Sequence, residues 1–204
     1  MALTCPVDFD VATLRSEIQT MYSRIAMSPG DEFHFHRGPE YAVTRLGYDS
    51  TELAALPLAV TSSFAGVGNP LAIRRIEDAA IVLDVGCGTG TDLLLAARRS
   101  GPRGRAIGID MTEAMRTRAA EGAADCGLVN VDVREGDATS LPLGDHSVDV
   151  VISNGVLNLV PNKHKALAEI ARVLKPGGRA QIADIVIGEV LPESALRDID
   201  LWTG

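Results

Sequence analysis

A short glycine-rich segment, residues 84–90 (DVGCGTG), holds the residues best suited to ligand chemistry. Its glycines alternate at Gly86, Gly88 and Gly90, directly after an apolar run that is typical of a strand. Glycine adopts positive φ without strain and lets the backbone come close to a ligand. A tight strand-to-helix turn needs only one such residue, so the alternation indicates a loop that cradles a ligand.

The spacing of the glycines bears on the kind of ligand. The dinucleotide fingerprint is G-x-G-x-x-G, and Thr91 stands here where its third glycine would be. The pattern therefore favours a nucleoside without a pyrophosphate, with an NAD-type Rossmann oxidoreductase as the alternative. Asp110 ends the next apolar run, and a carboxylate there accepts both hydroxyls of a ribose. Its simpler role would be to cap the following helix through Thr112.

These groups need a scaffold that brings strand ends together, and the pattern after about residue 80 predicts one. Strands are expected at 81–85, 106–110, 131–133, 147–153 and 180–187, and helices at 93–99, 112–125 and 163–174, the last stopped by the KPGG of residues 175–178. Near-continuous apolar strands that alternate with helices predict an α/β fold, a doubly wound (Rossmann-like) parallel sheet with helices on both faces. Such sheets bind ligands at the carboxyl ends of their strands.

The first part of the chain, residues 1–78, is predicted to be a helical N-terminal extension that forms a cap over the active site. The ligand-binding domain then occupies residues 79–204. Apolar residues at helical spacing predict a helix at about residues 9–27. A second helix is expected to begin at a capping box that starts with Asp49, and a short one to begin at Pro70.

Two histidines and an arginine, His34, His36 and Arg37, lie beside aromatic residues in this first part. Imidazole and guanidinium groups bind anionic or carbonyl substrates, and imidazole acts as a general base. The three residues are therefore a candidate substrate patch, with an ordinary surface loop as the alternative. The His-x-His pair has no third ligand in the pattern, so no metal site is predicted.

The composition is that of one folded domain with an appendage: 204 residues, of which 46% are hydrophobic and 23% charged. A formal net charge of −8 repels phosphate backbones and anionic lipid. The expected partner is a small molecule, with no nucleic acid and no membrane. The first ten residues carry two acids and no basic residue, no apolar run is long enough to span a bilayer, and the three cysteines are widely spaced. A cytoplasmic protein fits these features.

Four separated motifs resemble the ordered motifs of the Class I S-adenosyl-L-methionine (SAM)-dependent methyltransferases. They are residues 84–90, Asp110, residues 136–138 (GDA) and residues 174–178 (LKPGG), and the resemblance extends over residues 75–190. The resemblance implies that Asp84 and the glycine loop hold the methionine part of SAM and that Asp110 holds the ribose. It places Met111 against the adenine and Asp137 with Ala138 at the adenine amine. The cofactor-binding residues predicted in this way are Tyr22, Asp84, Gly86, Cys87, Gly88, Thr89, Gly90, Asp110, Met111, Asp137, Ala138 and Asn154.

The chain resembles the arsenite methyltransferase group more narrowly. The residues that carry this are 66–70 (GVGNP), 108–112 (GIDMT), 153–161 (SNGVLNLVP), 182–184 (IAD) and 191–193 (LPE), with Tyr22. That group grips trivalent arsenic with converging cysteine thiolates. This chain has Val67 and Gly155 at two of the cysteine positions, and a third family cysteine follows the region of Trp202.

Methyl transfer to a small acceptor is therefore expected, with arsenite in doubt as that acceptor. Asn154 and Gly155, after the fourth strand, join the candidate substrate patch. A SAM-binding protein without turnover is the further alternative. The resemblance implies two more strands after the fifth, and the residues from Glu189 to Gly204 fit only a short helix. The C-terminal strands are thus expected to be missing, and the uncovered sheet edge would allow a homodimer.

Overall fold

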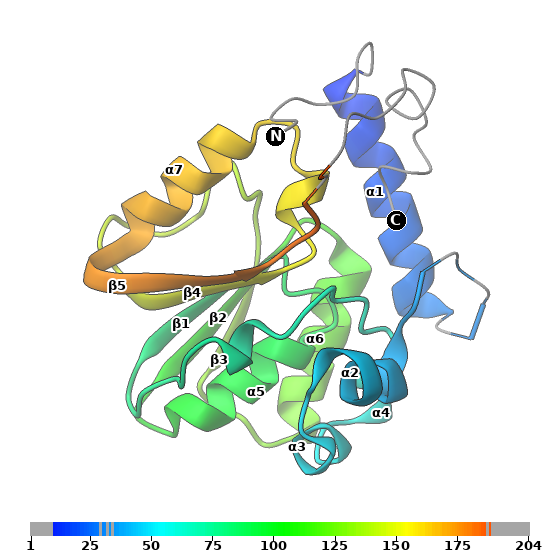
Figure 1. Cartoon of the computed structure of the whole chain (residues 1–204), viewed down its shortest axis with the longest axis horizontal. Coiled ribbons are helices and arrows are strands. Elements are labelled where there is room, and N and C mark those ends of the chain that lie inside the picture. The colour runs from blue at the N-terminus through cyan, green and yellow to red at the C-terminus, as the bar shows by residue number, and fades with distance from the viewer. Residues whose placement is uncertain (1–9, 29, 32, 34, 187, 189–204) are drawn as a thin grey trace.

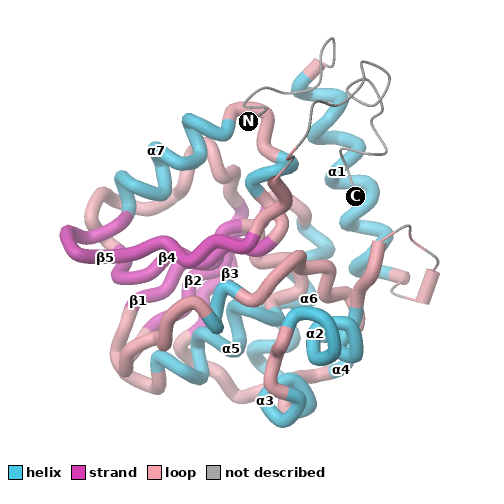
Figure 2. The backbone as a smooth tube through the Cα atoms, in the orientation of Figure 1, coloured by secondary structure: helices cyan, strands magenta, loops and turns pink. Residues whose placement is uncertain are grey.

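The computed structural model describes residues 10–28, 30–31, 33, 35–186 and 188. Its centre is a five-stranded, all-parallel sheet in the order β3-β2-β1-β4-β5 (Figures 1 and 2). The strands are β1 (Ile81–Val85), β2 (Arg105–Asp110), β3 (Val131–Glu135), β4 (Val148–Asn154) and β5 (Leu174–Ala183). The predicted doubly wound parallel sheet is confirmed, with the order reversing at β1 and β4.

Helices cover both faces of this sheet. α5 (Thr91–Ser100) and α6 (Glu113–Asp125) pack on one face, and α7 (Lys163–Val173) packs on the other, as Figure 1 shows. Alternation along β1 explains the two layers: Val82 joins the core with α5, whereas Leu83 joins the core with Ile170 of α7. The sheet is buried on both sides, so its strands are apolar almost throughout.

The N-terminal part adds α1 (Val11–Met27), α2 (Gly38–Leu46), α3 (Ser50–Ala54), α4 (Leu58–Thr61) and the 3₁₀ turn η1 (Pro70–Ala72). Asp49 caps α3, as predicted, by accepting from the backbone N–H groups of Thr51 and Glu52. α1 packs on α6 through Ile25 and Met115. The short helices contribute buried residues such as Leu53 to the same core as β1 and α5, so the described N-terminal residues pack directly onto the sheet domain.

One helix was not predicted, and one predicted strand is corrected. Residues 38–46 form the helix α2, which the pattern did not indicate, with Pro39 in its first turn and Gly47 ending it at φ 72°. The fifth strand begins at Leu174 rather than at residue 180 and ends at Ala183, so the KPGG of residues 175–178 lies inside it. Leu174 pairs with Val148, and pairing resumes only at Arg179, so these residues form a bulge. An edge strand tolerates proline and a bulge because one side of its ladder is unpaired.

β3 and β5 are the edge strands of the sheet. Two predictions concern residues after 188: a short helix, and the absence of further strands. Both fall outside the described residues. Within the described part of the chain, no helix is both long enough and apolar enough to cross a membrane.

Candidate functional site

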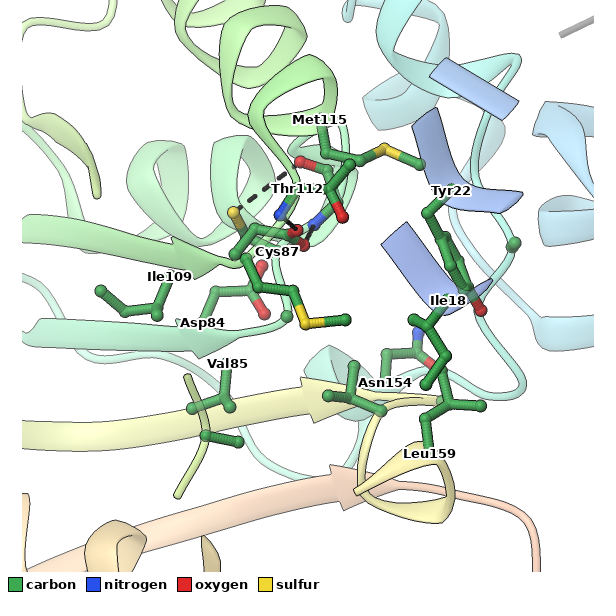
Figure 3. A pocket seen from close by; sticks show the side chains of 18 of the residues that line it. Ile18, Tyr22, Asp84, Val85, Cys87, Ile109, Thr112, Met115, Asn154 and Leu159 are labelled. Atoms are coloured by element: carbon green, nitrogen blue, oxygen red, sulfur yellow. Dashed lines mark hydrogen bonds between the residues drawn. The ribbon is translucent and has the colours of Figure 1, made fainter. Parts of the chain in front are cut away.

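A cavity lies at the carboxyl ends of β1, β2 and β4, where a doubly wound sheet binds ligands. Figure 3 shows Ile18 and Tyr22 of α1 on one side of it and Asp84 and Cys87 on the other. Eleven of the twelve predicted cofactor residues line the cavity: Tyr22, Asp84, Gly86, Cys87, Gly88, Thr89, Asp110, Met111, Asp137, Ala138 and Asn154. Residues far apart in the sequence thus meet in one place, while their contact with a cofactor stays a prediction.

The glycine loop is fixed to β2 by its backbone. The N–H groups of Gly86 and Cys87 both donate to the carbonyl of Ile109, at 2.7 and 3.1 Å. Gly86 has φ 72°, and a Cβ there would lie 2.4 Å from a methyl group of Val156. A side chain at position 86 would therefore be strained and would clash, which is why the sequence needs glycine there.

Asp110 serves the loop as well as the cavity. Its carboxylate accepts from the N–H of Gly88 at 2.9 Å and from the N–H of Thr112 at 2.8 Å. The helix-capping alternative is therefore seen, and a tie to the glycine loop is added to it. Burial raises the pKa of Asp110, although these two hydrogen bonds oppose the shift. The Thr112 side chain adds a third hydrogen bond, and the carboxylate, with about four acceptor sites, still has capacity for a ligand's hydroxyl group.

Asp84, near the end of β1, is a deeply buried acid of the site. Its side chain is 2% exposed, and its Oδ2 atom has no hydrogen-bond partner among the described residues. Burial raises the pKa of Asp84 well above its usual value, and the neighbouring Asp92 and Asp110 add to the shift. A buried carboxylate oxygen without a donor is costly. A cationic ligand in the cavity would satisfy it.

The opposite side of the cavity is closed by α1. Arg15 of α1 forms an ion pair with Asp137, whose other carboxylate oxygen accepts from the N–H and hydroxyl of Thr139 at 2.7 and 2.6 Å. Gln19 of α1 donates to the carbonyl of Met111 at 3.2 Å. Asp137 therefore stabilises the turn that follows Gly136, and its ion pair with Arg15 also ties α1 to the cavity.

Tyr22, from the same helix, carries a strongly perturbed hydroxyl. Burial raises its pKa to about 12, and the carboxylates of Asp110 and Asp184 contribute. The phenol stays protonated at neutral pH, so it is a hydrogen-bond donor at the cavity wall.

A buried polar network that the sequence pattern did not reveal supports Asn154. Its Nδ2 atom donates to Asp92 at 2.9 Å, and the hydroxyl of Tyr48 donates to the other oxygen of Asp92 at 2.6 Å. Asp92 is in the first turn of α5, so its closeness to the glycine loop was visible in the sequence. No signal in the sequence joins Tyr48 to it, because the two residues are 44 positions apart.

The candidate substrate patch is not brought together. Asn154 and Gly155 line the cavity, but His36 and Arg37 do not. His36 stacks on Tyr41, with ring centroids 5.4 Å apart, and the Arg37 guanidinium lies 4.2 Å from the centroid of the Phe33 ring. Both side chains therefore pack on aromatic rings of the N-terminal part and not on the cavity. His34 lies outside the described residues.

Gly90 is the one predicted cofactor residue that is not among the lining residues. It lies just before α5 with φ 96°, and a Cβ there would be 3.1 Å from the Cβ of Ala119 on α6. Its small size lets α5 begin close to α6, so the structure gives it a packing role.

The methyltransferase domain family model matches residues 76–201, which include the whole sheet and every strand end around the cavity. The chain belongs to this family. The resemblance inferred from the four motifs is thus confirmed.

The chain is similar in sequence to two arsenite methyltransferases. The chain is 42% identical over 160 residues to the arsenite methyltransferase of Halobacterium salinarum, and this match covers 78% of this chain and 41% of that protein. It is 36% identical over 151 residues to the arsenite methyltransferase of Aquipseudomonas alcaligenes, and this match covers 70% of this chain and 43% of that protein. The chain therefore spans less than half the length of these curated relatives.

A solved structure shares the fold. It is an arsenic(III) S-adenosylmethionine methyltransferase from Chlamydomonas reinhardtii, with a TM-score of 0.67 and 36% identity. The match covers 75% of this methyltransferase-family chain and 55% of the other.

Proposed function

We propose that this chain is a SAM-dependent methyltransferase that transfers a methyl group to a small acceptor. The observation that carries the proposal is the pair of carboxylates at the strand ends. Asp84 offers a buried oxygen without a donor, and Asp110 offers two oxygens beside the glycine loop. A ligand with a cationic methionine end and a ribose satisfies both, and SAM has these two parts.

The geometry of the loop fits the same ligand. Gly86, at φ 72°, lets the loop turn closely against Val156, and Thr91 stands where a dinucleotide site has glycine. SAM, when bound, supplies a methyl group on a sulfonium that already acts as a good leaving group. The chain's own residues then have to orient the partners and exclude water. α1 covers the cavity with Ile18 and Tyr22 for this purpose. Positioning of this kind supplies about 7–11 kcal/mol of a barrier.

We infer that the acceptor is held without thiolates. The arsenite methyltransferases resemble this chain, but Val67 and Gly155 occupy two of their cysteine positions. Cys87 is buried, and burial raises its pKa well above the usual value, so it remains a thiol. Cys126 ends α6, where its sulfur lies 3.5 Å from Arg98. The described cysteines therefore offer no converging pair for a soft metalloid.

We also propose a cytoplasmic protein that forms a homodimer through an uncovered sheet edge. Support for the dimer comes from β5, which hydrogen-bonds to β4 alone among the described strands. The net charge of −8 supports a small-molecule partner over nucleic acid. Sedimentation of the purified chain tests the dimer: a monomer at every concentration would contradict it.

Calorimetric titration with SAM and with NAD tests the ligand, and SAM alone is expected to bind. Turnover is then measured as formation of S-adenosylhomocysteine with arsenite, 2-mercaptoethanol, a phenol and a primary amine as acceptors. Product with one of the last three supports the proposal. SAM binding with no product from any acceptor would support a SAM-binding protein without turnover, and NAD binding without SAM would overturn the proposal.

A further inference from the structure

Tyr48 lies outside the cavity but is buried directly behind it. Its side chain is 4% exposed, and its ring packs edge-on against Phe64, with centroids 5.2 Å apart. Its hydroxyl donates to Oδ1 of Asp92 at 2.6 Å and accepts from Nδ2 of Asn154 at 3.1 Å. Burial and Asp92 raise the pKa of Tyr48, so the hydroxyl remains a donor. We refer to Tyr48, Asp92 and Asn154 as the Tyr48 network.

The Tyr48 network fixes which way the amide of Asn154 points. Nδ2 faces acceptors only: Oδ2 of Asp92 at 2.9 Å, the carbonyl of Gly68 at 2.8 Å and the hydroxyl of Tyr48. Oδ1 therefore faces the other way and accepts from the N–H groups of Val67 and Gly68, at 2.8 and 3.1 Å. A reversed amide would put its NH₂ group against these N–H groups.

Through this amide the network holds residues 64–68 against the end of β4. Phe64 and Gly66 of this segment line the cavity, and Gly155, next to Asn154, lies against Val67. The fit is close, because a Cβ on Gly66 would lie 2.4 Å from Nδ2 of Asn154. Phe64 is also held by the N–H of Gly38, which donates to its carbonyl at 2.9 Å, so the amide matters most for Val67 and Gly68, whose N–H groups donate to it.

We propose that Tyr48 is a positioning residue for methyl transfer, which holds the 64–68 segment at the acceptor end of the cavity through Asp92 and Asn154 and through its own 3.2 Å contact with the carbonyl of Gly68. The inference rests on the proposed function. Tyr48 does not itself line the cavity, although its partners Asp92 and Asn154 do. Its hydroxyl is therefore expected to affect the placement of the acceptor much more than the affinity for SAM. Removal of the hydroxyl leaves Asp92 with one donor fewer and Nδ2 of Asn154 with one acceptor fewer, which loosens the amide although its bonds to Asp92 and Gly68 remain.

The first experiment needs no acceptor. Tyr48→Phe keeps the ring and removes the hydroxyl, and Tyr41→Phe, at the ring that stacks on His36, is the matched control. Amide hydrogen exchange is followed at residues 64–68 and at β4. Tyr48→Phe is expected to speed exchange of Val67 and Gly68 at least about tenfold and to leave β4 and the control unchanged. Wild-type exchange at these two amides would overturn the inference.

A second variant guards against loss of folding. Asp92→Asn keeps one acceptor oxygen where Tyr48 and Asn154 each use one, so the network loses a hydrogen bond in either amide orientation and the same two amides should exchange faster. If Tyr48→Phe speeds exchange throughout β4 as well, Asp92→Asn decides between a local effect, confined to residues 64–68, and general unfolding, which would overturn the inference.

The second experiment separates positioning from structure. In Tyr48→Phe the SAM dissociation constant, measured by calorimetry, should stay within about twofold of wild type. With the acceptor that gives product in the turnover panel, kcat should fall at least tenfold at an unchanged KM for SAM. Equal losses in SAM affinity and kcat, or a wild-type kcat, would overturn the inference. If no acceptor gives product, the proposed function fails, and the exchange rates still decide whether Tyr48 holds the segment.

Discussion

Gly155 and Val67 lie against each other at the end of β4: a Cβ built on Gly155 would be 3.3 Å from Cγ1 of Val67. The resemblance to the arsenite methyltransferases places cysteines at these two positions. Two thiols there would meet, as a trivalent metalloid requires. In this chain a methyl group and a bare backbone meet instead, so the contact that would select arsenic has been replaced by an apolar one.

The first prediction is that the chain binds arsenite weakly. A single thiolate, or two that do not converge, cannot form the trigonal sulfur site that trivalent arsenic prefers. Titration of arsenite into the chain, followed by calorimetry and by loss of free thiols, should show no tight one-to-one binding. Tight binding that survives Cys5→Ser and Cys126→Ser would contradict the prediction and would point to ligands other than cysteine.

The second prediction is that Val67→Cys together with Gly155→Cys raises arsenite affinity at least about tenfold. The 3.3 Å contact brings the two side chains together, and the change from valine to cysteine relieves it. Gly155 has φ 69°, however, so a side chain there costs about 1–2 kcal/mol. The double variant should therefore melt at a temperature lower by about 2–8 °C. Each single variant serves as the control and should gain little affinity.

The third prediction concerns Asp110. Asp110→Ala should weaken SAM binding by about 1.5–3 kcal/mol, as loss of charge-assisted hydrogen bonds does. The structure adds a stability cost, because the N–H groups of Gly88 and Thr112 lose their acceptor. Asp110→Asn keeps one carbonyl oxygen and should fall between Asp110→Ala and wild type in both SAM affinity and melting temperature. An unchanged SAM affinity in Asp110→Ala would remove the residue from the site.

The sheet could be predicted from the sequence because its signals are local. An apolar run such as residues 81–85 that ends in glycines reads as a buried strand, and the structure places β1 on the same residues. The fifth strand was predicted too late because proline and glycine at 176–178 read as a turn. Only pairing with β4, which tolerates a bulge at an edge, makes this segment part of a strand.

Part of the candidate site could likewise be predicted from the sequence, and part could not. Residues of the glycine loop and Asp110 follow strand ends, so the topology alone brings them together at the cavity. His36 and Arg37 lie in a segment with no such rule, and their stacking partners Tyr41 and Phe33 decided their direction. Tyr48 could not be predicted, because its bond to Asp92 depends on how the N-terminal helices pack on α5.

The fourth prediction is that Asp84→Asn stabilises the ligand-free chain and weakens its binding of SAM. Burial raises the pKa of Asp84 in the folded chain above the usual 3.8, so the folded state holds a proton more tightly than the unfolded state. The stability that this proton contributes is complete below pH 3.8 and is lost as pH rises through the raised pKa. At pH 7 the buried acid therefore costs stability, and the neutral amide removes that cost together with the repulsion from Asp92.

Thermal unfolding without SAM at pH 7 measures the effect. Asp84→Asn should raise the melting temperature by about 2 °C or more, the shift that roughly 1 kcal/mol produces in a chain of this size. Glu17→Gln, the same exchange of acid for amide on the exposed side of α1, should change it little. SAM affinity should fall at least about tenfold, since the amide offers no charge to a cationic methionine end. A lower melting temperature with unchanged SAM affinity would mean that Asp84 is a structural residue held by contacts within the chain. A carboxylate that binds a cationic ligand should instead give a higher melting temperature and a weaker SAM affinity when it is replaced by the amide.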